Sequence, residues 1–321
     1  MSRSERRSGV GVGDVWYDPP LTEALERVSD GNLDLGLRLI KQARGRNDLR
    51  ALRVSRLGEA VGGHLDVLAG KFGDDPDALL WLGSARVSLA WEIRGGGYAK
   101  YVTQDAFRGF REVLKTAAEP LFTAADLVPD DPVPWQCLQW FGLGMSLPRP
   151  DLDGFWAETE ARDPALWAGR HARLQTLCEK WRGSNEEAYE FAKETALTAE
   201  TGDPVVAMLP LAHFEIAERR MLADDGQLDH ELIVKSHFSR PEVQRELAET
   251  TDRWMSAPHD HPMTTEARHL FGAAFYYGGD HDRARRIMTD LPMRIPEWLP
   301  WGSASLLPRR TYLKVRRELG V

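Results

Sequence analysis

The sequence predicts an all-α protein: an α-solenoid, or α-α superhelix, of antiparallel helix pairs. Three observations support this fold class. Strand-like runs of alternating Val, Ile and Thr are nearly absent, apolar residues recur at steps of three and four, and Asp-Pro pairs precede several apolar runs. Steps of three and four place side chains on one face of a helix. Since neighbouring repeats bury each other's apolar faces, about six stacked helix pairs are expected over residues 15–321.

The clearest apolar stripe lies between residues 107 and 128. Pro120 falls inside this stripe and has no backbone N–H, so the helix is predicted to kink or restart there. Two further stripes lie within residues 167–181 and 188–199. The first stripe consists of Phe107, Phe110, Leu114, Ala117, Leu121, Ala124 and Val128.

Asp-Pro pairs are predicted to mark helix starts. An aspartate carboxylate at the N-cap accepts a hydrogen bond from an otherwise unpaired backbone N–H. A proline at the first helical position needs no N–H there. The pairs are Asp75-Pro76, Asp131-Pro132, Asp163-Pro164 and Asp203-Pro204.

The spacing of small and bulky residues resembles the tetratricopeptide-repeat family. In the best match, over residues 268–296, a Leu-Gly-like pair and an aromatic lie on one helix, a small residue lies on the next, and a proline closes the unit. Gln139 stands where the family has a small residue, and Gly95-Gly96-Gly97 lengthens one unit. Small residues let helices approach closely, while bulky ones fill the space between pairs. The predicted repeat-packing residues are Gly83, Trp135, Gly272, Phe275, Ala284 and Pro296.

A second resemblance rests on residues 180–184, with the sequence Lys-Trp-Arg-Gly-Ser, followed by Phe191-Ala192. This pattern is similar to uncharacterised actinobacterial helical-repeat proteins. That resemblance implies a helical repeat and no particular activity.

Composition limits the domain organisation and the location. The 321 residues suffice for two average domains or one elongated array. Residues 1–14 are predicted to form a flexible tail and residues 15–321 a single helical-repeat domain. The N-terminus shows no apolar secretory region, and no apolar run is long enough for membrane insertion, so a cytoplasmic location is expected.

Charge is unevenly distributed. The net charge is −8, which makes general nucleic-acid binding unlikely because that requires cationic contacts to phosphates. From Asp282 onward, however, nine Lys or Arg residues accompany four Asp or Glu residues. A solvated helix surface explains this basic C-terminal segment, and an anionic partner is the alternative.

The sequence contains no complete catalytic constellation. His213 and Glu215 lie at i and i+2 of one predicted helix and should point to different faces. His171 and Cys178 are two helical turns apart, too far for a direct hydrogen bond on one straight helix. His259 and His261 lack further ligands at a zinc-motif spacing, so no metal and no cofactor are predicted. His171, His213 and Glu215 remain the candidates if the chain is an enzyme.

Eleven tryptophans are the most unusual feature of the composition. Most should fill space between helices, but tryptophan is also enriched in binding hot spots. The repeat resemblance implies a cytoplasmic scaffold whose concave groove binds a protein or peptide, and Trp140, Trp156, Arg170 and Arg182 are the predicted groove residues. The alternative is an enzyme, or an accessory protein of a tailoring pathway, with a pocket between helices. A third hypothesis is that the basic C-terminal segment docks on nucleic acid or anionic lipid.

Overall fold

A computed structural model describes residues 9–13, 15–95, 102–223, 229–257, 260–297, 299–305 and 307–321. The described chain is almost entirely helical, which confirms the predicted all-α class. It forms two compact units. Residues 18–176 form one, here called the insert unit; residues 177–321, together with the segment preceding residue 18, form the other, here called the flanking unit. The predicted domain over residues 15–321 therefore includes parts of both units.

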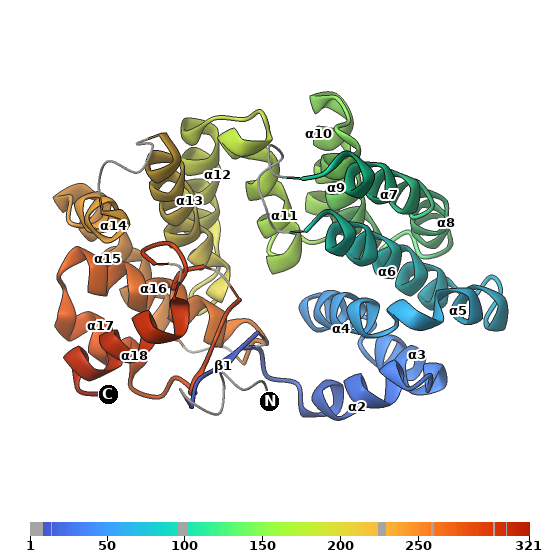
Figure 1. Cartoon of the computed structure of the whole chain (residues 1–321), viewed down its shortest axis with the longest axis horizontal. Helices are drawn as coiled ribbons and strands as arrows, with labels where there is room; N and C mark the ends of the chain where they lie inside the picture. The colour runs from blue at the N-terminus through green and yellow to red at the C-terminus, as the bar shows by residue number, and fades with distance from the viewer. Residues whose placement is uncertain are drawn as a thin grey trace. The chain divides into compact units, whose positions relative to one another are not determined.

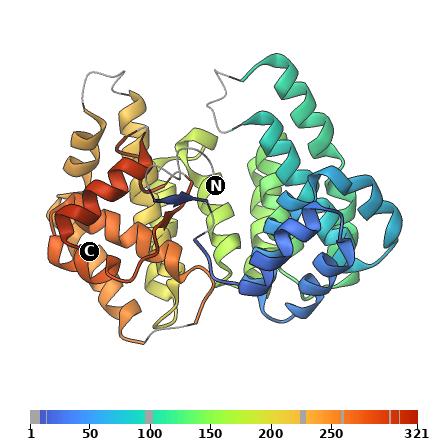
Figure 2. The ribbon, with the colours of Figure 1, turned by 60° about the horizontal axis from the view of Figure 1, so that its bottom comes forward.

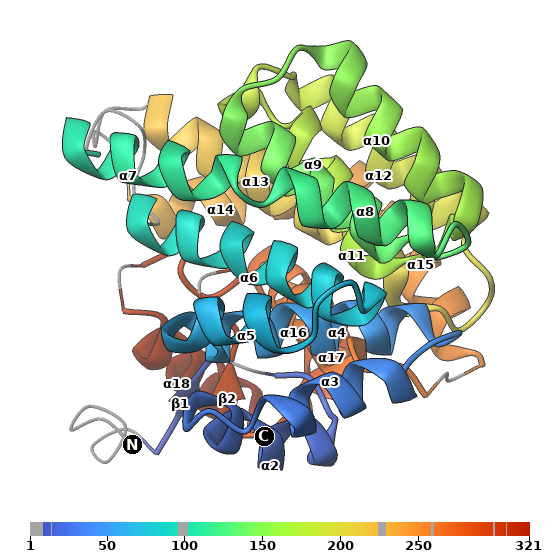
Figure 3. The ribbon, with the colours of Figure 1, turned by 90° about the vertical axis from the view of Figure 1, so that its right-hand side faces the viewer.

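The insert unit consists of helices that pack largely against helices one or two places away in the sequence. Figure 3 shows α5, α6 and the row formed by α7 and α8 lying one after another. The helices are α2 (Pro19–Ser29), α3 (Leu33–Gln42), α4 (Asn47–Ala60), α5 (Leu65–Lys71), α6 (Pro76–Arg94), α7 (Gln104–Lys115), α8 (Ala118–Leu127), α9 (Val133–Met145) and α10 (Arg149–Arg162), with the 3-10 turn η1 (Gly62–His64) before α5 and α11 (Trp167–Leu177) reaching the boundary.

The Asp-Pro prediction is confirmed at Asp75 and Asp203, which cap α6 and the 3-10 helix Pro204–Ala207. It is wrong at Asp163, which follows the end of α10, because α11 begins only at Trp167. Asp75 accepts hydrogen bonds from the backbone N–H groups of Asp77 and Ala78 at the start of α6. The carboxylates of Asp131, Asp163 and Asp203 likewise each accept a backbone N–H two residues later. The predicted restart near Pro120 is also confirmed, because α7 ends at Lys115 and Pro120 lies in the first turn of α8.

Glycines lie at close crossings between helices of the insert unit. A Cβ atom added at Gly83 of α6 would lie 2.5 Å from Leu121 Cγ of α8. A Cβ added at Gly142 of α9 would lie 2.7 Å from Leu152 Cδ2 of α10. Real side chains do not tolerate such distances, so each crossing requires glycine as long as its neighbour stays in place.

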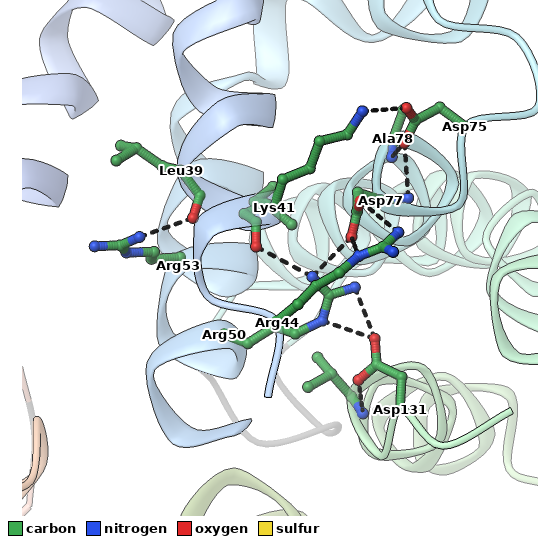
Figure 4. A network of polar contacts seen from close by, with 11 residues as sticks. Leu39, Lys41, Arg44, Arg50, Arg53, Asp75, Asp77, Ala78 and Asp131 are labelled. Atoms are coloured by element: carbon green, nitrogen blue, oxygen red, sulfur yellow. Dashed lines mark hydrogen bonds and ion pairs between the residues drawn. The ribbon is translucent and has the colours of Figure 1, made fainter. Parts of the chain in front are cut away.

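A buried network of charges connects three helices of the insert unit (Figure 4). Arg50 of α4 places Nη1 2.8 Å from Asp77 Oδ1 and Nη2 2.7 Å from Asp131 Oδ2. The same guanidinium donates to the carbonyl oxygen of Ile40 at 3.1 Å, near the end of α3. Arg44 adds a second cation, 2.6 Å from Asp77 Oδ2. Each buried charge therefore has an opposite partner, as burial requires.

Arg53, one turn after Arg50, repeats this arrangement at a second site. Its Nε atom lies 2.7 Å from Asp18 Oδ2, and its Nη1 atom donates to the carbonyl oxygen of Leu39 at 2.8 Å. Asp18 caps α2 by accepting the N–H of Leu21. One face of α4 thus holds the start of α2 and the end of α3.

The flanking unit is also helical, with one short pair of parallel strands (Figures 1 and 2). Gly272 of α16 lies at a tight crossing, where an added Cβ would be 2.6 Å from Met288 Cγ of α17. Ala284 and Phe275 are fully buried in the same pair of helices. The elements are β1 (Gly11–Val12), η3 (Glu179–Trp181), α12 (Asn185–Thr198), η4 (Pro204–Ala207), α13 (Met208–Ala223), α14 (His230–Phe238), α15 (Pro241–Met255), α16 (Thr264–Gly278), α17 (His281–Met288), β2 (Arg294–Ile295) and α18 (Pro308–Leu319).

Residues 11 and 12, within the predicted N-terminal tail, pair in parallel with residues 294 and 295. Pro296, the predicted closing proline of the last repeat, follows β2 directly and is partly exposed. Across the described ranges, none of the helices combines the length and the apolar character that crossing a bilayer requires.

Candidate functional site

Four aromatic rings form a row across the insert unit. Trp91 of α6 lies edge-to-face with Phe110 of α7, with ring centroids 5.2 Å apart. Trp140 of α9 packs edge-to-face on Trp91 at 6.0 Å, and His171 of α11 packs on Trp140 at 5.7 Å. Phe110 is buried, whereas Trp91, Trp140 and His171 are partly exposed. We call these four residues the aromatic row.

The rings of the aromatic row support one another through edge-to-face contacts. Edge-to-face contacts place the positive edge of one ring on the negative face of the next, which fixes the angle between them. The Arg94 guanidinium carbon lies 5.4 Å from the Trp91 ring centroid, a cation–π distance, and burial lowers the pKa of Arg94. The row therefore presents pre-positioned aromatic surface with one cation beside it.

The other predicted groove residues are placed differently. Trp156 and Arg170 contact each other, with the guanidinium carbon 4.9 Å from the ring centroid, and both are less than one tenth exposed. Arg170 Nε also donates to the carbonyl oxygen of Pro164 at 2.6 Å. Arg182 is exposed, on a turn of the flanking unit with a left-handed φ of 75°. Among the predicted groove residues, Trp140 is thus the one with a partly exposed ring.

Trp135, predicted as a packing residue, belongs to a second aromatic cluster in the insert unit. Its ring lies 6.1 Å from that of Phe122 and 6.5 Å from that of Phe155. Arg162 covers the Trp135 ring at 5.4 Å and donates to the carboxylate of Glu158. Phe122 is 39% exposed, so this cluster also reaches the surface.

A chain of polar side chains runs through four helices of the flanking unit. His213 of α13 lies at its centre. Its Nδ1 atom is 3.0 Å from Nε2 of His237 on α14, and its Nε2 atom is 2.9 Å from Oε1 of Glu246 on α15. Tyr189 of α12 donates its hydroxyl to Glu246 Oε2 at 2.7 Å. Arg240, just before α15, places Nη2 3.1 Å from His237 Nδ1 and 3.3 Å from Nε2.

The direction of these hydrogen bonds follows from the donors available. Arginine can only donate, so Nδ1 of His237, the nearer nitrogen, accepts and its Nε2 carries the proton. His237 then donates to Nδ1 of His213, and His213 donates from Nε2 to the Glu246 carboxylate. Both nitrogens of both imidazoles are therefore used inside the protein, and neither ring keeps a free lone pair for proton abstraction.

The pKa values of three residues in this chain of polar side chains are shifted from their ordinary values. Burial, the positive field of Arg240 and the proximity of His213 lower the pKa of His237 to about 2, so the ring is neutral. For Glu246, burial works against ionisation, but hydrogen bonds from His213 and Tyr189 outweigh it and lower the pKa. Burial, followed by the hydrogen bond to Glu246, raises the pKa of Tyr189.

The remaining catalytic candidates, Glu215 and His171, are not part of this chain of polar side chains. Glu215 faces away from His213, as predicted from their i, i+2 spacing, and pairs instead with Lys180 at 2.6 Å. His171 belongs to the aromatic row of the insert unit, whereas His213 and Glu215 belong to the flanking unit. Cys178 is buried just after α11 ends, and burial raises the pKa of its thiol.

Much of the basic C-terminal segment is paired within the flanking unit. Arg283 contacts the carboxylates of Asp252 and Asp280. Lys314 lies 2.9 Å from Glu231, and Arg285 donates to the carbonyl oxygen of Leu319 at 2.7 Å. These pairs favour a packing role over a continuous cationic surface.

Within the described residues, no group of three or more His, Cys, Asp or Glu side chains has an arrangement that could hold a metal ion. The candidate His259 lies outside the described residues. His261 accepts the backbone N–H of Met263, which closes a local turn.

Sequence reasoning missed most partners in both arrangements. Trp91 and Phe110 of the aromatic row, and Tyr189, His237 and Glu246 of the polar chain, come from helices whose pairing no local pattern reveals. The sequence contains one usable signal, because His237 and Arg240 are three residues apart at a helix boundary marked by Pro241.

Comparisons with known proteins do not identify a family for this chain. No protein-family model matches the chain, and a search of curated proteins finds no match.

Proposed function

We propose that the chain is a cytoplasmic interaction module with a tetratricopeptide-like helical array, and that its aromatic row binds an apolar segment of a protein partner. The observation that carries this proposal is the position of Trp140, whose partly exposed ring is held edge-to-face between Trp91 and His171. Three helices, α6, α9 and α11, contribute one of these rings each.

Rigid aromatic rings are suited to this role. Tryptophan buries a large area and loses little conformational entropy, which is why it dominates binding hot spots. Trp140 is already fixed by its neighbours, so a ligand side chain that packs on it does not need to order it. The tight crossings at Gly83 and Gly272 support the repeat-like packing that is expected to present such a surface.

The arrangement of His213 favours binding over acid–base catalysis. A general base needs a lone pair within reach of its substrate. Both nitrogens of His213 instead hydrogen-bond to His237 and Glu246, and the chain joins four helices. We therefore assign this polar chain a structural role.

A displayed library of random peptides tests the proposal. Peptides enriched on the purified chain are synthesised, and their affinity is measured by calorimetry for the wild type, Trp140→Ala and Phe122→Ala. Phe122 is the matched control because its ring is also partly exposed in the insert unit but belongs to the second aromatic cluster. Loss of a hot-spot ring should weaken binding by about tenfold or more in Trp140→Ala, while Phe122→Ala binds like the wild type. Equal affinity in wild type and Trp140→Ala would reject the aromatic row as the binding surface.

A further inference from the structure

The N-terminal segment occupies a strand-shaped site on the flanking unit. β1 and β2 lie side by side (Figure 2). Gly11 pairs with Arg294 and Val12 with Ile295 in a parallel register. The N–H of Gly11 donates to the carbonyl oxygen of Met293 at 2.9 Å, and the N–H of Gly13 donates to that of Ile295 at 3.0 Å. This is the hydrogen bonding by which an extended peptide is added to the edge of a strand.

One side chain anchors the segment. Val10 is fully buried, so its aliphatic side chain is enclosed by the protein. The Arg294 side chain lies over the strand, with its Cζ and Nε atoms 3.4 Å from the position that a Cβ of Gly11 would take. The site therefore accepts a short extended segment with one aliphatic anchor, next to a residue that lies under Arg294.

Glycines border the docked segment on both sides. Gly9 has a φ of 68° and Gly13 a φ of 117°, in a region that favours glycine. Such positions allow the backbone to change direction. The segment is also short, with two residues in the strand ladder, so few interactions have to break for it to leave.

A second copy of this chain carries the identical segment, and exchange of identical elements between protomers requires no new interface. We propose that the site beside β2 accepts residues 10–12 of a second copy, which replace the segment of the same chain and link two molecules. The occupant is defined by the structure itself, because the docked sequence shows which anchor and which small residue fit.

Pairs of introduced cysteines can show whether the strand beside β2 comes from the same chain or from a second copy. Gly11 and Arg294 are register partners, so the double variant G11C/R294C should form a disulfide within one chain when its own segment is docked. The decisive sample mixes the single variants G11C and R294C, carried by full-length chains with tags of different size. A disulfide between them requires the strand of one copy on β2 of the other. The native Cys137 and Cys178 are both buried, which keeps them out of this reaction.

The expected result is a tagged heterodimer on a non-reducing gel, formed several times faster than in a mixture of R294C with L197C. Leu197 is 65% exposed in the flanking unit and provides the collisional background. Adding V10D to the G11C chain should return the yield to this background, because a charge does not replace the buried anchor. Exchange is rejected if G11C/R294C closes internally while the mixture stays at background. It is equally rejected if the double variant does not close, or if V10D leaves the mixed yield unchanged.

Discussion

Arg50 Nη1 lies 2.8 Å from Asp77 Oδ1, and neither side chain is more than 2% exposed. The same guanidinium reaches Asp131, so one cation holds acidic residues at the starts of α6 and α9. Removing Arg50 would leave Asp77 with Arg44 but take the buried cation away from Asp131, and breaking such a group is more harmful than replacing all of it.

Arg50→Met should therefore destabilise the insert unit by about 3–5 kcal/mol, since Asp77 and Asp131 lose a buried partner. The measurement is the midpoint of urea unfolding, followed by circular dichroism. Arg108→Met is the control, because Arg108 forms an exposed pair with Asp105 and its removal should leave the midpoint unchanged. Similar midpoints for the two variants would contradict the structural role assigned to Arg50.

Two glycines in helix interiors of the insert unit should respond in opposite directions to alanine. Gly83→Ala places a methyl group 2.5 Å from Leu121 Cγ and should destabilise the protein by about 1–3 kcal/mol. Gly154 has no neighbouring atom within 4 Å of an added Cβ, so Gly154→Ala should stabilise α10 by about 0.5–1 kcal/mol. Thermal unfolding of both variants beside the wild type measures the two shifts. A stabilised Gly83→Ala would show that α6 and α8 do not cross as described.

Stability should fall in mild acid. Burial and nearby positive charge lower the pKa of His237 from 6.5 to about 2, and burial lowers that of His269 to about 3. A histidine with a lowered folded-state pKa contributes stability that is complete above its unfolded value and decreases as the pH falls below it. Between pH 7 and pH 5 the two groups together should remove roughly 4 kcal/mol. Urea midpoints across this range measure the slope.

The variant His237→Gln cannot titrate, so it should lose about half of that slope between pH 7 and pH 5. An unchanged slope in this variant would place the proton uptake elsewhere. A wild-type midpoint that is flat over the same range would contradict the burial of both imidazoles.

The two thiols should be inert in the native protein. Burial raises the pKa of Cys137 to about 12 and also raises that of Cys178. At pH 8 about one in ten thousand Cys137 side chains would be the reactive thiolate. Ellman's reagent should therefore detect both cysteines only after denaturant is added. Rapid labelling of either thiol without denaturant would show that its surroundings open readily.

Local signals predicted the helices well. Asp75 caps α6 where its Asp-Pro pair indicated, and Pro120 lies in the first turn of a new helix. Asp163 is the exception, because its carboxylate closes a turn and α11 begins only at Trp167. These features depend on residues within one helical turn of each other, so they can be predicted from the local sequence.

Contacts between distant residues could not be predicted in the same way. No local pattern links Arg50 to Asp77 and Asp131, which lie far from it in the sequence and contact it only in the folded structure. His213 was a recognised candidate, but its role depends on His237 and Glu246, which come from two other helices. Trp156 and Trp140 looked equivalent by composition, yet Arg170 covers one of them and the other is partly exposed.

The chain order of the two units has a consequence for synthesis. Residues 18–176 leave the ribosome before any later residue, so this part has all of its own packing partners early. Val10 and Gly11, although made earlier, cannot dock before Arg294 and Ile295 have been synthesised. The whole of the insert unit and most of the flanking unit are therefore translated before residues 10–12 reach their final position.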